Sequence, residues 1–394
     1  MIWSTPPELS QRAIDSTRGT PTMGNSNFGL EQLRGRNLVA KPPASIKPLN
    51  YIVYNPRFFD SLVPYIVFRA GHRIVWNYRC PRERTALWSG SVILAAKTGL
   101  SFSPCQITGF FSICDAPRDP LKIGSTGAGV NLHQGVTTSV RISRASRAKL
   151  AISFNGKPLA HPVVSRAVVQ EHLERSSETL QVNVLHKGIL PMGCGYGTSG
   201  AGALSLSLAL NQALGSYLSE IEAAQIAHKA EVKYKTGLGT VTSAFCGGLT
   251  IRTRAGAPGI GEVKRIIPSS SLRVVSGAFG PISTAGVLTN SGLRKRINLC
   301  GRGLVSLQTK SPETNTFIRL SRRFADCLGI FSPRLRGAIG NMQRGQIVSS
   351  MMMIGESLFT VVRRDLVPEA RAGIKSAGLI PVVSKISRQG AVVY

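Results

Sequence analysis

The sequence predicts a folded protein of alternating α and β segments that is long enough for two domains, and three observations support this fold class. The chain has 394 residues, 43% of them hydrophobic, which is enough for two domains with cores of ordinary size. From about residue 100 onward, segments with strand patterns and segments with helix patterns follow one another. A glycine-rich run without charged residues, 191–215, follows a predicted strand and leads into a predicted helix.

The first predicted elements lie before this run. The segment KLAISFNGKPLA, residues 149–160, predicts a β-hairpin because Asn155-Gly156 is a preferred two-residue turn. Residues 162–175 have the apolar spacing of a helix, and residues 180–186, LQVNVLH, alternate as a strand does.

Further elements follow the glycine-rich run. Residues 218–234 predict a second helix, and residues 247–254, GGLTIRTR, predict a strand that ends in basic side chains. A second region of strands and helices begins near residue 256, with helices expected at 313–329 and 368–378. No internal repeat is apparent.

The N-terminal part differs from the rest. All three tryptophans and two proline pairs lie before residue 98, and no sustained periodicity is present there. We interpret residues 1–97 as a basic, poorly ordered extension, which a start site near Leu100 would remove. The two predicted domains then cover residues 98–255 and 256–394.

Charge and cysteine content restrict the function classes. The net charge is +29, but the basic residues are spread along the chain, so a dedicated nucleic-acid role is not the first expectation. Seven cysteines without a CxxC pair argue against a disulfide framework and a zinc site. The N-terminus lacks the pattern of a signal peptide. We therefore expect reduced thiols and a cytoplasmic protein.

The glycine-rich run, PMGCGYGTSGAGALSLSLALNQALG, is long enough to span a bilayer, so three interpretations compete. They are a phosphate-binding loop with its helix, a buried core helix and a membrane span. Glycines at 193, 195 and 197 disfavour a helix there and allow a ligand to approach the backbone. Because a helix N-terminus binds anions, we favour the phosphate-binding loop.

This run resembles the P-x-x-x-G-L-G-S-S-A signature of the GHMP kinase superfamily, with Tyr196 in place of the leucine and Thr198 in place of the first serine. Segments 101–130, 227–240 and 280–288 also resemble those of the archaeal pantoate kinases, in the same order. The resemblance covers about residues 101–394. It implies that the loop wraps the phosphates of ATP. The residues that it assigns to the nucleotide are Pro191, Gly193, Gly195, Gly197, Thr198, Ser199, Gly200 and, from the segment MMMIGESLF, Gly355.

The resemblance implies the α+β class and a two-domain GHMP kinase fold, with an N-terminal domain related to a ribosomal protein, an α/β C-terminal domain and the active site in the cleft between them. The implied activity is the ATP-dependent phosphorylation of pantoate at its 4-hydroxyl group, towards coenzyme A. The implied cofactors are ATP and Mg²⁺. The partners are these small molecules, without a membrane or nucleic acid, and the chain is compatible with a homodimer.

The resemblance also assigns roles to individual side chains. Ser199 and Glu231 would hold Mg²⁺, an oxygen pair that suits this ion. Ser125, His228 and Arg252 would bind the substrate, with Arg252 facing its carboxylate. From the residues alone, the spacing of His228 and Glu231 favours a solvated helix face. A simple turn can explain Ser125, and an exposed strand end can explain Arg252.

Two positions depart from the family's pattern. Thr240 stands in GLGT where the family has GLGD, with the aspartate as its expected catalytic carboxylate. Threonine cannot act as a base near neutral pH. Gln106 stands where the family has histidine, and its role stays open. Three alternatives therefore remain, which are a slower pantoate kinase, a GHMP kinase for another small hydroxy acid or alcohol, and a non-catalytic nucleotide- or RNA-binding relative.

Overall fold

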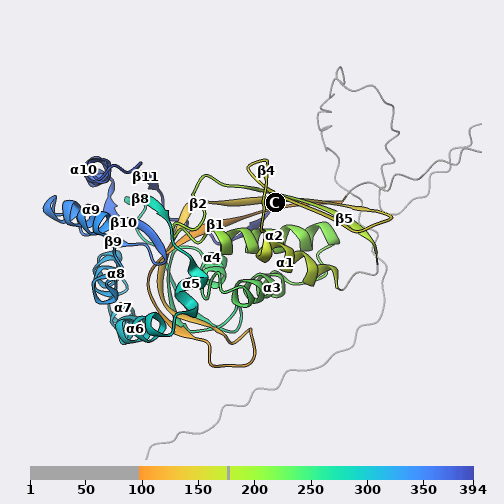
Figure 1. The fold of residues 1–394 in the computed structure, drawn as a ribbon, viewed down its shortest axis with the longest axis horizontal. Coiled ribbons are helices and arrows are strands. Elements are labelled where there is room, and N and C mark those ends of the chain that lie inside the picture. The colour runs from red at the N-terminus through yellow and green to blue at the C-terminus, as the bar shows by residue number, and fades with distance from the viewer. Residues whose placement is uncertain (1–96, 175–177) are drawn as a thin grey trace, which may run out of the picture. The chain divides into compact units, whose positions relative to one another are not determined.

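Two β-sheets organise the part of the chain that this computed structural model describes, residues 97–174 and 178–394 (Figure 1). The first sheet contains β1 (Lys97–Cys114), β2 (Gly124–Arg144), β3 (Lys149–Phe154), β4 (Lys157–Pro158), β5 (Leu180–Lys187), β6 (Leu249–Arg254), β7 (Glu262–Ile266) and β12 (Val392–Val393). The second contains β8 (Leu272–Pro281), β9 (Ser350–Met351), β10 (Gly355–Arg363) and β11 (Val382–Ser384). The helices are α1 (Val163–Leu173), α2 (Thr198–Leu214), α3 (Glu220–Lys233), α4 (Thr240–Cys246), α5 (Thr284–Thr289), α6 (Ser291–Gly301), α7 (Leu304–Lys310), α8 (Thr314–Leu328), α9 (Pro333–Arg344) and α10 (Val367–Ser376), with the short 3₁₀ helix η1 (Arg364–Leu366) before α10.

The long strand β2 determines how the first sheet is built. It pairs antiparallel with β1 along nearly its whole length. Its second half pairs with β5, whereas its first half pairs with β6, so that Gly127 lies opposite Arg252. Residues near the start of β2 are therefore brought next to a strand that is more than 100 positions away in the sequence.

Helices α1 to α4 cover one face of the first sheet (Figure 1). Apolar side chains of the sheet, such as Val140 and Val184, share one core cluster with side chains of α2 and α3, such as Leu204 and Ile226. Helix α2 is apolar around most of its circumference, and this explains why its sequence lacks charge. A helix that is buried on all sides needs no polar face.

The second sheet and helices α5 to α10 pack against the C-terminal half of β1 and the N-terminal half of β2 (Figure 1). Phe110 and Phe111 of β1 contact Phe317 and Phe324 of α8, with ring centroids 6.4 Å and 5.9 Å apart. Two later strands, β7 and β12, belong to the first sheet. The predicted division at residue 255 stays a prediction, as do the limits of the extension, because residues 1–96 lie outside the described residues.

Most of the elements expected from the sequence are confirmed. The hairpin turns at Asn155 and Gly156, which have φ angles of 49° and 80°. The helices expected around the glycine-rich run and in the C-terminal part correspond to α1, α2, α3, α8 and α10. Within the described residues, no helix combines the length and the apolar character that a bilayer span requires. The interpretation of the glycine-rich run as a membrane span is therefore wrong.

The expectation that all thiols are reduced is wrong for one pair of cysteines. Cys300 at the end of α6 and Cys327 at the end of α8 form a disulfide bond, with Cα atoms 5.7 Å apart. Four further cysteines of the described residues are free, namely Cys105, Cys114, Cys194 and Cys246. Sequence spacing could not reveal the pair because the packing of α6 against α8 brings the two thiols together.

Removal of this disulfide should lower stability. The bond closes a chain segment with a sequence separation of 27, and loop-closure entropy gives about 3.5 kcal/mol for a segment of this size. We expect the Cys300→Ser/Cys327→Ser variant to unfold at a lower urea concentration than the wild type. Reduced wild type should match the variant, and Cys114→Ser should match oxidised wild type. Identical midpoints for the variant and the oxidised wild type would contradict a stabilising disulfide.

Candidate active site

The glycine-rich run forms an open loop in front of α2. Gly193, Gly195 and Gly197 all have positive φ angles, of 76°, 85° and 64°, which favour glycine. Gly197 is also the N-cap of α2, and no side chain caps the helix there. The amide groups of the first turn are thus available to an anion, which the partial positive charge of the helix N-terminus attracts. Thr198 Oγ donates to the carbonyl oxygen of Pro191 at 3.3 Å and closes the loop.

Ser199 and Glu231 meet beside this helix start. The Ser199 hydroxyl donates to Glu231 Oε1 at 2.6 Å, and Thr236 donates to the same oxygen at 2.6 Å. Glu231 is 2% exposed, and this burial raises the pKa of its carboxyl, whereas the two hydroxyl groups oppose the shift. The structure brings Ser199 and Glu231 together, as the resemblance implies. It adds Thr236, for which the sequence gives no signal beyond its place in the KTGLGT segment.

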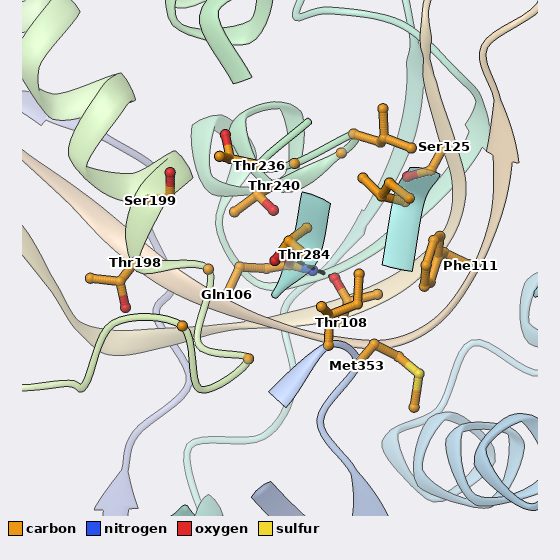
Figure 2. Close-up of a pocket in the computed structure, with 18 of the residues that line it drawn as sticks. Gln106, Thr108, Phe111, Ser125, Thr198, Ser199, Thr236, Thr240, Thr284 and Met353 are labelled. Atoms are coloured by element: carbon orange, nitrogen blue, oxygen red, sulfur yellow. Dashed lines mark hydrogen bonds between the residues drawn. The ribbon is translucent and has the colours of Figure 1, made fainter. Parts of the chain in front are cut away.

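A cavity connects the glycine-rich run with the start of β2 (Figure 2), and we call it the main cavity. It is lined by Gln106, Thr108, Phe111, Ser125, Gly193, Gly195, Gly197, Thr198, Ser199, Thr236, Gly237, Leu238, Gly239, Thr240, Arg252, Thr284, Leu288, Met353 and Ile354. None of these lining residues is Asp, Glu or His. The cavity thus combines hydroxyl groups and one cation with an apolar wall.

Arg252 supplies this cation. Its side chain is buried, its Nε donates to the Ser125 carbonyl oxygen at 3.2 Å, and its Nη1 donates to Ser243 Oγ at 2.7 Å. Burial lowers the pKa of Arg252 to about 10, so the guanidinium remains protonated at neutral pH. No carboxylate of the described residues pairs with it. The expectation of an exposed strand end is therefore wrong, and a buried cation without a counter-ion favours an anionic ligand.

His228 lies outside the lining of the main cavity. It is 1% exposed, and its Nε2 donates to the carbonyl oxygen of Ile123 at 2.9 Å. Burial lowers the pKa of its imidazole. In this arrangement His228 supports the segment that precedes Ser125, so an effect on the substrate would pass through that segment. Its assignment as a substrate-binding residue stays a prediction.

Gly355 and Gly200, which the resemblance also assigns to the nucleotide, lie in close contact with neighbouring parts of the chain. Gly355, the first residue of β10, lies against the loop backbone, and a Cβ atom there would be 2.3 Å from the carbonyl carbon of Cys194. A Cβ atom at Gly200 would be 2.9 Å from Glu231 Oε2 and 2.8 Å from Thr240 Cγ2. Thr240 itself is the first residue of α4 and faces the main cavity (Figure 2). Glu231 and the side chain at position 240 are therefore neighbours.

A second, largely apolar cavity adjoins the glycine-rich run. It shares Gly193, Thr198, Ser199 and Thr236 with the main cavity. Its further lining residues are Phe154, Leu159, His161, Pro162, Val163, Val164, Ser165, His186, Met192 and Gly202. The glycine-rich run thus lies between an apolar cavity and a cavity that contains a buried cation. This arrangement suits the transfer of a phosphoryl group between two ligands, one in each cavity.

Comparison with known proteins agrees with this geometry. Residues 163–248, which include the glycine-rich run, Glu231 and Thr240, match the family described as "GHMP kinases N terminal domain". The pantoate kinase of Thermococcus kodakarensis is 33% identical over 274 residues, which are 69% of this chain and 90% of that protein. The pantoate kinase of Methanocaldococcus jannaschii is 30% identical over 285 residues, 72% of this chain and 99% of that protein.

Solved structures show the same fold. A structure described as a phosphotransferase related to the CoA biosynthesis pathway has a TM-score of 0.69 at 30% identity, and the match covers 75% of this chain and 98% of that one. A homoserine kinase from Cytophaga hutchinsonii has a TM-score of 0.57 at 14% identity, covering 78% of this chain and 100% of that one. At 14% identity, the similarity to the homoserine kinase shows the fold alone.

Proposed function

The chain belongs to the pantoate kinase family within the GHMP kinases, and on this premise we propose that it transfers the γ-phosphoryl group of ATP to the 4-hydroxyl group of pantoate. The products would be 4-phosphopantoate and ADP. The observation that carries the proposal is the main cavity, which joins an anion-binding loop to the buried Arg252.

The acceptor side of the proposal rests on charge and shape. Arg252 has no carboxylate partner among the described residues and can bind the pantoate carboxylate through two parallel hydrogen bonds. Phe111, Leu238 and Leu288 give the cavity an apolar wall, against which the two methyl groups of pantoate can pack. A branched hydroxy acid needs this combination of one cation and an apolar wall.

The nucleotide side rests on the loop and the second cavity. The phosphates of ATP would accept hydrogen bonds from the amides around Gly195 and Gly197 and from the first turn of α2. The apolar second cavity, which reaches Phe154 and Met192, would take the adenine ring. ATP would then cross the glycine-rich run, with its γ-phosphate directed into the main cavity.

The oxygen atoms of Ser199 and Glu231 fit a magnesium ion. Both are hard donors in hydrogen-bond contact, and the described residues contain no group of three or more acidic, histidine or cysteine ligands. Such a site leaves most positions of the ion to water and phosphate oxygens, as Mg²⁺ prefers with nucleotides. When bound, Mg²⁺ would neutralise charge on the β- and γ-phosphates.

The transfer step then depends on positioning. The 4-hydroxyl oxygen forms a bond to the γ-phosphorus, the bond from that phosphorus to the β-γ bridging oxygen breaks, and the hydroxyl proton is released. Arg252 holds the carboxylate end of the acceptor, and the loop holds the phosphates in line with the hydroxyl group. The lining of the main cavity contains no carboxylate, so we expect no lining side chain to take the proton at neutral pH.

An ADP-release assay on the full chain tests the proposed function. We expect ADP formation that depends on pantoate and saturates with it, and a product that carries phosphate at the 4-position by NMR. Homoserine, mevalonate and a reaction without acceptor are the comparison arms. ADP release that is faster with another acceptor, or independent of any acceptor, would contradict the proposal. The cytoplasmic location and a homodimer stay predictions alongside it.

The substitution Thr240→Asp should increase the turnover number. The new carboxylate would lie at the first position of α4, where the helix N-terminus favours negative charge. Its neighbour Glu231 would raise the pKa of the new carboxyl towards neutrality, which suits a general base. We expect kcat at saturating substrates to rise by about tenfold or more.

The matched control for this substitution is Thr240→Asn, which has the same shape as the aspartate variant but no charge. It should give no increase in kcat. If Thr240→Asp leaves kcat unchanged or lowers it while its melting temperature stays near that of the wild type, proton removal does not limit this enzyme.

A further inference from the structure

Gln106 has a buried hydrogen-bond donor without a protein partner. The residue is 1% exposed, and its Nε2 has no hydrogen-bond partner among the described residues. Its other amide atom, Oε1, accepts a hydrogen bond from Thr108 Oγ1 at 3.1 Å. A buried donor that stays unpaired is costly, so a ligand that pairs with it gains binding energy.

Contacts with the glycine-rich run and with β2 hold Gln106 in place. The Gln106 backbone N–H donates to the Tyr196 carbonyl oxygen at 2.9 Å, which ties the residue to the glycine-rich run. Its amide lies directly over Gly129 of β2, where a Cβ atom would be 1.6 Å from Nε2. Any side chain larger than hydrogen at position 129 would therefore displace the Gln106 amide.

The strand register places the Gln106 amide two residues along β2 from the position that pairs with Arg252. Gly127 is paired with Arg252, and Gly129 lies two positions further along β2, a distance of about 6–7 Å for extended backbone. In Figure 2 the Gln106 side chain lies below Thr240, with Ser199 to the upper left and Ser125 to the upper right. An acceptor whose carboxylate binds Arg252 therefore extends past the Gln106 amide on its way to Ser199.

We propose that Gln106 is a specificity-determining residue that binds the 2-hydroxyl group of the acceptor, with its Nε2 donating to the hydroxyl oxygen. The inference rests on the proposed function. The carbon next to the carboxylate carries this hydroxyl group, so one acceptor reaches Arg252 and Gln106 at the same time. The 4-hydroxyl group stays free for transfer at the Ser199 end. Gln106 thus selects 2-hydroxy acids, and Arg252 alone does not.

The test compares two acceptors, pantoate and 4-hydroxy-3,3-dimethylbutanoate, which lacks only the 2-hydroxyl group. The full-length wild type should prefer pantoate in kcat/KM by about tenfold, the effect of one lost hydrogen bond at a buried donor. Gln106→Met, which has a similar length but no donor, should lose this preference. Its kcat/KM values for the two acceptors should lie within about twofold of each other.

A second variant and a matched control complete the test. Gln106→Asn keeps the amide but shortens the side chain by one methylene group, and it should lose the same preference. Gln225→Met makes the same substitution on α3, outside both cavities, where the amide donates to the Pro258 carbonyl oxygen, and it should keep the preference.

The outcomes separate the inference from the proposed function. A wild type that phosphorylates neither acceptor contradicts the proposed function. A wild type that phosphorylates both equally well contradicts only the role of Gln106. If the Gln106 variants keep the wild-type preference, or lose activity on both acceptors by the same factor, Gln106 does not bind the 2-hydroxyl group.

Discussion

Replacing Glu231 with glutamine should lower kcat by about 100- to 1,000-fold, because Glu231 is a buried carboxylate in contact with Ser199 at the start of α2 and would hold Mg²⁺ there. Glutamine has the same shape and can still accept a hydrogen bond from Ser199 or Thr236, so the fold should survive. Steady-state kinetics with varied Mg²⁺ measure the effect, and we expect the variant to need a higher Mg²⁺ concentration for half-maximal activity.

The same substitution should stabilise the protein in the absence of ligands, and the effect depends on pH. Burial raises the pKa of Glu231 in the folded state above the unfolded value of about 4.3. Between these two values the folded state binds more protons, so stability falls as pH rises through this window. The glutamine variant does not titrate. It should therefore melt at a higher temperature than the wild type at pH 8, and the difference should shrink towards pH 4.

Glu220→Gln is the matched control, because Glu220 lies exposed in the first turn of the same helix. It should change neither kcat nor the Mg²⁺ requirement. A Glu231→Gln enzyme with the kcat and the Mg²⁺ dependence of the wild type would refute the metal assignment. A melting temperature below that of the wild type at pH 8 would show that the two hydroxyl contacts outweigh the cost of burial.

The local part of the site could be predicted from the sequence. The run from Pro191 to Ser199 has alternating glycines and no charge. Such a loop and the helix after it depend mainly on residues that are adjacent in the chain, and a sequence pattern can therefore predict them. The loop and α2 are confirmed. Ser199 and Glu231 were placed together through the family resemblance rather than through their spacing, because 32 positions separate them. Burial of Glu231 was not foreseen, since a helix pattern alone cannot say which face packs on the sheet.

The long-range part could not be predicted. The strands β1 and β2 have no clean alternation, because both of their faces are covered along part of their length. The contact between Arg252 and Ser243 depends on how α4 packs against β6, and the unpaired amide of Gln106 depends on the register of β1 with β2. These contacts join segments that are distant in the sequence, and the pattern of a single sequence does not reveal them.

Replacing Arg252 with alanine should raise the KM for pantoate by about 100-fold or more and leave the KM for ATP within about threefold. A buried pair of a guanidinium and a carboxylate loses on the order of 3–5 kcal/mol when one partner is removed, because the other charge stays buried without compensation. Arg252→Lys should recover only part of this loss. An ammonium group cannot donate to the Ser125 carbonyl oxygen and Ser243 with the geometry of the planar guanidinium.

A neutral acceptor distinguishes loss of this charge pair from a general disturbance of the cavity. The wild type should prefer pantoate strongly over the amide of pantoate, and Arg252→Ala should have lost most of that preference. Arg254→Ala is the matched control, because Arg254 lies two positions along β6 and forms an exposed ion pair with Glu262. If Arg252→Ala raises the KM of the acid and of the amide by the same factor, Arg252 shapes the cavity but does not bind the carboxylate.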